Sequence, residues 1–102
     1  IDVIYSHNDA MTLGALDVLE RRGIVPARDI LLITVDGEKE AVDALKAGRI
    51  NCVVQCTPDL GRDVMRLVQD LQDGKDIPRA IHPEEGAFTD LDDLTDPSVE
   101  GF

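Results

Sequence analysis

The stretch DILLITVDGEKEAVDALKAG, residues 29–48, decides the fold class, because a strand pattern gives way within it to a helix pattern. Its first half holds six consecutive apolar or β-branched residues, 30–35, and such a run is typical of a parallel strand covered on both faces. A helical period follows and ends at Gly48, a residue type that commonly stops helices. In this period the apolar side consists of Ala41, Val42, Ala44 and Leu45, and the charged side of Lys39, Asp43 and Lys46.

The same strand–helix unit precedes this stretch. Residues 2–6 form a short apolar run, and residues 9–22 carry an amphipathic helix pattern that stops at Gly23. Asn8 and Asp9 are ordinary N-cap residues, since their side-chain oxygens accept the free N–H groups of a first helical turn. The apolar side predicted for this helix consists of Met11, Ala15, Leu16, Val18 and Leu19.

A third unit follows the quoted stretch. Residues 51–56 predict a strand, and residues 57–74 predict a helix that Thr57 caps, with Pro58 at the first helical position and Gly74 as the stop. One face of this helix is apolar at the 3.6-residue period. That face consists of Leu60, Val64, Leu67, Val68 and Leu71.

The remaining residues predict less regular structure. Two short strands are expected around residues 79–82 and 87–89, and residues 90–102 form an acidic, proline-broken tail that we expect to be surface or loosely ordered chain. The order of strand and helix patterns predicts an α/β fold, with flanking helices on a parallel sheet whose crossovers are right-handed.

Polar residues follow the first two predicted strands at the edge where parallel sheets bind ligands, beyond the carboxyl ends of the strands. Asn8 follows the first strand and Asp36 the second, so we expect these two residues to lie close together. An amide beside a carboxylate can bind sugar hydroxyls, because the carboxylate accepts O–H bonds and the amide both donates and accepts. The alternative is capping, by Asn8 of its own helix and by Asp36 of the next one.

Charge and motif content exclude several functions. The net charge of −11 over 102 residues argues against nucleic acid and anionic membranes, which require clustered Lys and Arg. No apolar run approaches the roughly 18 residues of a membrane span. His7 and His82 lack metal-ligand spacing to another His or Cys, and no nucleophile–base pair or phosphate-binding loop is present. We therefore expect no metal, no cofactor and no enzymatic activity.

The two cysteines are not expected to pair with each other. If residues 51–56 are extended, Cys52 and Cys56 lie about 13 Å apart at about 3.3 Å per residue. A disulfide requires Cα atoms within about 7 Å. The ordinary role of Cys56 is that of a small buried hydrophobic residue.

Three segments carry a resemblance to a known family. YSHNDAMTLGALDVLERRGI, DILLITVDGEKEAVDALKAGRINCVVQCTPDLG and GKDIPRAIHPEEGAFT resemble the C-terminal third of periplasmic sugar-binding proteins of ABC importers, the ribose/galactose type. The resemblance covers about residues 1–89 and implies the type I periplasmic binding protein fold. DGEKEA, CTPDLG and EGAFT look closest to the galactofuranose-binding branch.

The resemblance implies ligand-binding roles for three residues. The Asn and Asp of the family's motifs bind sugar hydroxyls, which assigns these roles to Asn8 and Asp36. Cys56 stands two residues before a proline at the hinge position where Gln or Asn is common, and cysteine is a poor hydrogen-bonder. The ligand expected is a monosaccharide of the pentose, galactose or galactofuranose class. The implied partner is an ABC permease, and the implied location is the periplasm, or the exterior of a Gram-positive cell with a membrane anchor.

The resemblance also divides the chain, which starts inside an apolar run without Met and is expected to be a C-terminal fragment. Residues 1–50 would belong to the C-terminal lobe, 51–58 to a hinge crossing, 59–78 to a helix and loop of the N-terminal lobe, 79–89 to the return crossing and 90–102 to the acidic tail. We expect such a piece to bind sugar poorly alone, and to self-associate through its Leu60/Val64/Leu67/Leu71 face.

Two related alternatives stay open at this point. The effector-binding domain of a LacI-type transcription repressor shares the fold and a similar ND-MA-GAL motif, but usually has Asp-Asp or Asp-Asn where this chain has DGEKEA. A sugar-sensing input domain of a membrane receptor is the second alternative. A flavodoxin-like enzyme would require a phosphate-binding loop or a catalytic cluster, and the sequence contains neither.

Overall fold

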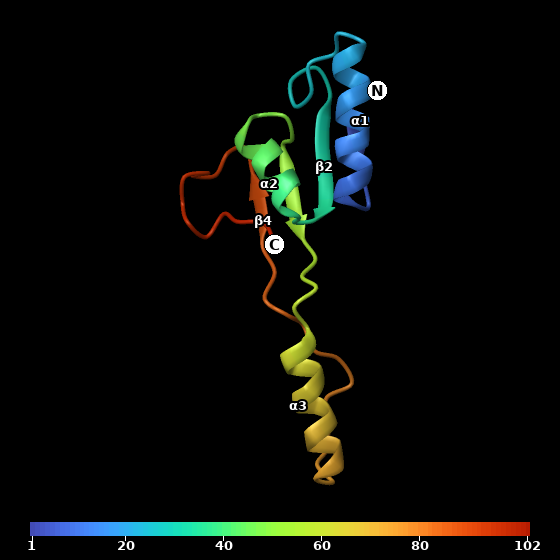
Figure 1. The fold of residues 1–102 in the computed structure, drawn as a ribbon, viewed down its shortest axis with the longest axis vertical. Helices are drawn as coiled ribbons and strands as arrows, with labels where there is room; N and C mark the ends of the chain where they lie inside the picture. The colour runs from blue at the N-terminus through green and yellow to red at the C-terminus, as the bar shows by residue number, and fades with distance from the viewer.

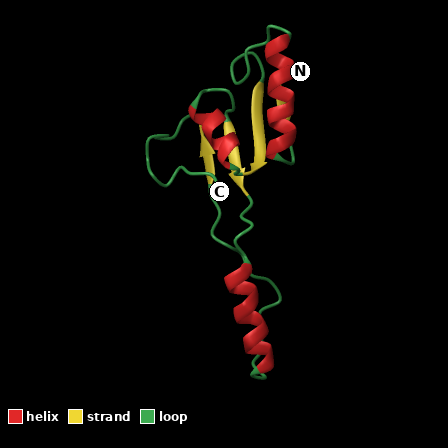
Figure 2. Ribbon diagram, in the orientation of Figure 1, coloured by secondary structure: helices red, strands yellow, loops and turns green.

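The computed structural model describes all residues 1–102 and has four strands and three α-helices (Figure 1). The molecule is elongated, with principal extents of 60 × 26 × 18 Å. Strands and two helices make up one end, and the third helix stands apart at the other (Figure 2). In chain order the elements are β1 (Val3–Tyr5), α1 (Asp9–Arg21), β2 (Leu31–Asp36), α2 (Lys39–Lys46), β3 (Cys52–Gln55), α3 (Gly61–Gln72) and β4 (Ala87–Thr89).

The sheet has the strand order β1-β2-β3-β4, which follows the chain. β1, β2 and β3 are parallel, as predicted, with Val3 opposite Leu31 and Ile33 opposite Cys52. β4 pairs with β3 in the antiparallel sense, with Val53 opposite Phe88. The reason is visible in Figure 1, where the chain leaves β3, forms α3 and returns alongside its outward path, so that β4 enters the sheet from the opposite direction.

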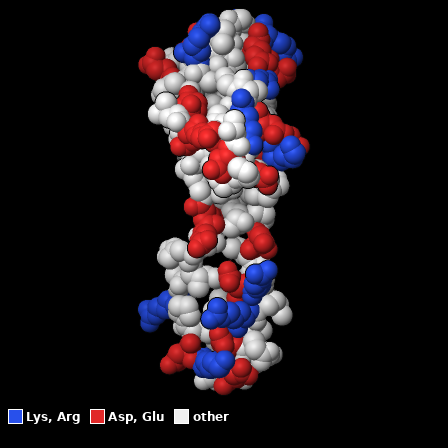
Figure 3. Space-filling model, turned by 90° about the vertical axis from the view of Figure 1, so that its left-hand side faces the viewer, with Lys and Arg blue, Asp and Glu red and all other residues white.

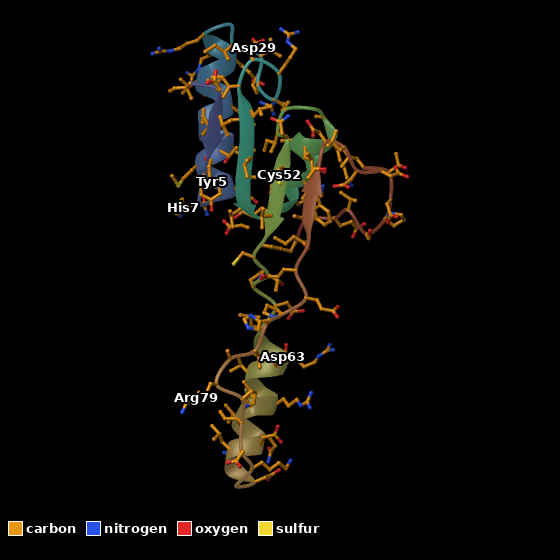
Figure 4. The ribbon with its side chains drawn as sticks, turned by 180° about the vertical axis from the view of Figure 1, so that it is seen from behind. Tyr5, His7, Asp29, Cys52, Asp63 and Arg79 are labelled. Carbon is orange, nitrogen blue, oxygen red and sulfur yellow. The ribbon has the colours of Figure 1, made fainter.

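Both sheet-covering helices lie on one face of the sheet. β-α-β crossovers are right-handed in nearly all proteins, so two successive crossovers in the same direction along a sheet bring both helices to the same side. Figure 4, seen from behind, shows β2, β3 and β4 in front of these helices. The prediction that residues 30–35 form a strand covered on both faces is therefore wrong for this chain, and Leu31 is 47% exposed.

The core lies between this covered face and helices α1 and α2. The predicted apolar side of α2 is confirmed, since all four of its residues are buried. The predicted side of α1 is wrong in part, because Met11 is 61% exposed and Val18 also faces solvent, whereas Thr12 is fully buried. The buried hydrophobic residues are Leu16, Leu19, Leu32, Ala41, Val42, Ala44, Leu45, Ile50, Val53 and Val99.

Helix α3 begins later than the sequence predicts. Thr57 does not cap it and Pro58 is not its first residue, because these residues form a turn before the helix. In that turn the hydroxyl of Thr57 accepts from the N–H of Asp59 at 3.2 Å, and the carbonyl of Pro58 accepts from the N–H of Leu60 at 2.9 Å. The predicted stop is confirmed, since Gly74 has a φ of +72°. None of the three helices combines the length and the apolar sequence that a membrane span requires.

The predicted apolar face of α3 contacts no other helix or strand. None of the helix residues is buried, and Leu71 is 56% exposed. The return segment that follows α3 runs beside it (Figure 1). The predicted strand at residues 79–82 is absent, because no strand lies beside this segment to pair with it.

The acidic tail, residues 90–102, is folded against the sheet end of the molecule. The prediction of surface or loosely ordered chain is wrong for Val99, which is only 5% exposed and belongs to the core, and for Leu94, which packs against that core. Leu91 is 93% exposed, as the prediction expects. The carboxylates of Asp93 and Asp96 accept hydrogen bonds from Thr95 and Ser98, each from both the hydroxyl and the backbone N–H. These local turns are compatible with a strongly acidic sequence because they use the carboxylates as acceptors.

Candidate functional site

The three residues singled out from the sequence meet at the carboxyl edge of the sheet. The side-chain amide of Asn8 donates to Asp36 Oδ2 at 2.6 Å. The backbone N–H of Cys56 donates to the carbonyl of Asp36 at 2.7 Å. Parallel strands β1, β2 and β3 end side by side, and this brings together residues that are far apart in the sequence.

Asn8 both caps a helix and contacts the candidate site. Its Oδ1 accepts from the N–H of Met11 at 3.3 Å, which is the N-cap bond of α1. Its Nδ2 carries two N–H groups, and Asp36 takes one of them. The amide is thereby fixed by two bonds, and its second N–H has no partner in the chain.

Asp36 does not cap α2, which was the alternative role. The N-cap of α2 is Glu38, and no side chain makes a cap bond there. Asp36 has a φ of +128°, a backbone conformation that side-chain-bearing residues rarely adopt and that costs of order 1–3 kcal/mol. Gly37 follows at φ +93° and fits closely against β3, since a Cβ there would lie 2.9 Å from Gln55 Cγ. Such strain persists only where surrounding contacts fix the backbone.

Asp9 supplies part of that support, whereas the sequence predicts only an N-cap role for it. Its fully buried carboxylate accepts from the backbone N–H groups of Gly37 at 2.8 Å and Glu38 at 2.7 Å. It also accepts from the hydroxyl of Thr34 at 2.6 Å, and that hydroxyl accepts in turn from Thr12 at 2.8 Å. Asp9 therefore holds the turn after β2. The available sequence signal is a threonine pair, one in an apolar strand and one three residues after Asp9.

The two cysteines differ from each other. Both are free, which confirms that they do not pair. Cys56 is exposed, so its expected role as a buried hydrophobic residue is wrong. Burial raises the pKa of the half-buried Cys52 thiol, and the negative charges of Asp90 and Asp92 raise that pKa further.

Gln55, which precedes Cys56, serves the structure and not the candidate site. Its Oε1 accepts from the N–H of Gly86 at 2.9 Å, and its Nε2 donates to the carbonyl of Glu100 at 3.3 Å. The side chain therefore joins β3 to the return segment and to the tail.

An aromatic pair that sequence reasoning did not single out stands beside Asn8. The rings of Tyr5 and His7 meet edge to face with centroids 5.2 Å apart, and Figure 4 shows both at the end of β1. Both side chains are exposed. They extend the row of polar and aromatic groups along the carboxyl edge of the sheet.

The edge is an open surface and not a closed pocket. None of the three surface hollows of the chain is lined by Asn8, Asp36 or Cys56. No group of three or more His, Cys, Asp or Glu side chains is placed to hold a metal ion. Figure 3 shows acidic residues around the narrow waist that joins the two ends of the molecule. Chemically, the edge offers hydrogen-bond donors and acceptors to a neutral polar ligand.

Comparison with known proteins places the chain in a family. Residues 1–76 match the periplasmic binding protein domain family, and the chain belongs to it. The fructose import binding protein of Bifidobacterium longum is 33% identical over 85 residues, which are 83% of this chain and 25% of that protein. The galactofuranose-binding protein of Escherichia coli is 35% identical over 60 residues, which are 59% of this chain and 19% of that protein.

A solved structure agrees with the fold. The periplasmic binding protein component of the arabinose ABC transporter from Shewanella sp. ANA-3, bound to α- and β-L-arabinofuranose, matches with a TM-score of 0.82 at 32% identity. The match covers 88% of this chain and 30% of that chain. The chain thus spans a quarter or less of the length of these curated relatives and under a third of this structure. The α/β fold and the resemblance predicted from the sequence are confirmed.

Proposed function

We propose that the chain forms one wall of a monosaccharide site in the solute-binding component of an ABC sugar importer. The observation that carries the proposal is the hydrogen-bonded pair of Asn8 and Asp36 at the carboxyl edge of the sheet, in a chain of the periplasmic binding protein family. The family consists of transport proteins and not of enzymes. The relatives named above are import binding proteins, which favours this function over a LacI-type repressor or a receptor input domain.

The contacts suit a sugar ring with several hydroxyls. Asp36 Oδ1 is an acceptor, and the second N–H of Asn8 is a donor, so adjacent hydroxyls can bond to both groups. Charge-assisted hydrogen bonds to a carboxylate are about twice as strong as neutral ones. Cys56 borders the same edge with a small thiol and contributes shape more than hydrogen bonding.

The ligand class is a pentose, galactose or galactofuranose, and within it we favour furanose forms. The support is that named relatives bind galactofuranose and arabinofuranose. A furanose ring is smaller than a pyranose ring. Cys56 has a shorter and less polar side chain than the Gln or Asn that is common at this hinge position, so it offers a sugar fewer hydrogen bonds there.

The open edge supports a site that needs a second wall. We propose the division stated from the sequence, with residues 1–50 in one lobe, 51–58 and 79–89 as crossings, and α3 in the other lobe. Closure of the two lobes would bury the sugar, and the closed form would present both lobes to an ABC permease in the periplasm or at the cell exterior. The ligand drives closure only by binding the closed state more tightly than the open one.

Isothermal titration of the full-length protein tests the proposal with D-ribose, D-fructose, D-galactose and L-arabinose. The variant Asp36→Ala is compared with Asp63→Ala, a carboxylate removed from exposed helix α3 (Figure 4). We expect micromolar or tighter binding of one sugar, abolished by Asp36→Ala and retained by Asp63→Ala. Absence of binding to every sugar by a folded protein, or full binding by Asp36→Ala, would contradict the proposal.

A further inference from the structure

The last two residues of the tail, Gly101 and Phe102, contact the turn after Asp36 and the start of α2. They lie beyond residues 1–76, which match the family. We propose that residues 99–102 act as a clasp that fixes this turn in its ligand-binding conformation, and that Gly101 is the positioning residue that makes the clasp possible. This inference rests on the proposed function of Asp36. Figure 1 shows the chain end returning to the sheet beside α2 and β4.

The clasp is anchored before it reaches the turn. Val99 is inserted in the core, and the N–H of Val99 donates to the carbonyl of Asp96 at 3.0 Å. Glu100 receives a hydrogen bond at its carbonyl from the side chain of Gln55. These two contacts fix the position of the chain just before Gly101 and Phe102.

Phe102 then makes two main-chain hydrogen bonds across the turn. Its N–H donates to the carbonyl of Gly37 at 3.1 Å, and its carbonyl accepts from the N–H of Lys39 at 3.1 Å. The N–H of Lys39 belongs to the first turn of α2, where no residue of the helix can satisfy it. The tail thus supplies a partner that the cap residue, Glu38, does not.

Gly101 allows the tail to approach this closely. A Cβ at this position would lie 2.5 Å from Lys39 Cα and 2.6 Å from the nitrogen of Lys39. The atoms it would meet belong to the backbone, so no flexible side chain can move aside. Only glycine fits there, because it alone has no Cβ.

The position of the clasp explains why it would matter for binding. The strained backbone of Asp36 is held by the N–H of Cys56 at its own carbonyl, and the turn after it is held by Asp9 at two N–H groups. Phe102 provides a further support, because its N–H donates to the carbonyl of Gly37. Without the clasp one support of a strained turn is lost, and Asp36 can relax away from Asn8.

The first test reads the clasp without any ligand. Amide hydrogen exchange of the 102-residue chain is followed by NMR in Gly101→Ala and in Gly61→Ala, a matched glycine where an added Cβ meets nothing within 4 Å. We expect Gly101→Ala to speed exchange at Lys39 by about tenfold or more, while exchange at core residue Leu32 stays unchanged, as local opening leaves other regions protected. Gly61→Ala should leave both amides as in the wild type.

A second variant removes the hydrogen-bond donor of Phe102 without adding a Cβ at Gly101. Phe102→Pro lacks the N–H that bonds Gly37, and it should also speed exchange at Lys39. Unchanged exchange at Lys39 in both Gly101→Ala and Phe102→Pro would overturn the clasp, whatever the protein binds.

The second test reads the link to the ligand. The full-length protein is titrated with the four sugars named above, and Gly101→Ala should weaken the binding of the preferred sugar about tenfold at an unchanged unfolding midpoint. Faster exchange at Lys39 with unaltered affinity would overturn the positioning role. If the wild type binds none of the sugars, the proposed function fails, and the exchange experiment still decides whether the clasp exists.

Discussion

Removing the carboxylate of Asp9 should destabilise the chain strongly. The carboxylate of Asp9 is fully buried and accepts hydrogen bonds from the backbone N–H groups of Gly37 and Glu38. In Asp9→Ala both N–H groups lose this acceptor. An unsatisfied buried donor costs about 1–3 kcal/mol. The Gly37 N–H is buried and carries the full cost, whereas the Glu38 N–H is partly buried and costs less, so we expect a total loss of about 2–4 kcal/mol. The hydroxyl of Thr34 keeps its contact with Thr12. The total free energy of unfolding of a small domain is about 5–15 kcal/mol, so this loss is a large share of it.

Asp9→Asn should cost less than Asp9→Ala for a reason specific to this site. The asparagine oxygen can accept from Gly37 and Glu38, and its NH₂ group can donate to the hydroxyl of Thr34 if that hydroxyl turns. The bonds lose their charge assistance, which amounts to roughly half of their strength. We expect a loss of about 1–2 kcal/mol for this variant.

Urea unfolding followed by circular dichroism measures both variants at neutral pH, with Asp2→Ala as the control. Asp2 is exposed and its side chain makes no hydrogen bond, so its removal should leave the urea midpoint unchanged. Equal stability of Asp9→Ala and wild type would refute the reasoning. So would a greater loss for Asp9→Asn than for Asp9→Ala.

Two further predictions concern the tail and α3. Hydrogen bonds from Thr95 and Ser98 lower the pKa values of Asp93 and Asp96 below the ordinary value of 3.8. The stabilisation of the tail by these two carboxylates is therefore present above pH 3.8 and is lost as the pH falls through their lower folded pKa values. The NMR amide shifts of Thr95 and Ser98 should titrate with midpoints below pH 3.8, and midpoints at or above pH 3.8 would contradict the prediction. The exposed apolar face of α3 should make the isolated chain self-associate. In sedimentation equilibrium, Val64→Glu should shift the chain toward the monomer, whereas the control Gln69→Glu should not. A monomeric wild type would refute the predicted self-association.

Elements whose local signals agree with their surroundings were predictable from the sequence. Helices α1 and α2 have clear stop signals, and the apolar side predicted for α2 is confirmed. Asn8 is the N-cap of α1 and also a candidate site residue. The parallel direction of the strands is then enough to predict that Asn8 and Asp36 lie close together. The backbone strain at Asp36 was not predictable, because it depends on the supports from Asp9, Cys56 and the tail.

The missed features share one cause, which is competition between a local signal and a tertiary contact. Asp9 reads as a helix cap, but its carboxylate is used across the sheet by the turn after β2. Thr57 and Pro58 read as a helix start, but the hydroxyl of Thr57 closes a turn earlier. Val99 is a single apolar residue in an acidic stretch, so nothing local indicates that it enters the core.

The central claim is that Asn8 and Asp36 hold the hydroxyls of a monosaccharide. A crystal structure of the full-length protein with its bound sugar measures this most directly. The account predicts ring hydroxyls within about 3 Å of Asp36 Oδ1 and of Asn8 Nδ2, with the bond between Asn8 and Asp36 retained. A sugar bound elsewhere, with both side chains facing only solvent or protein, would contradict it.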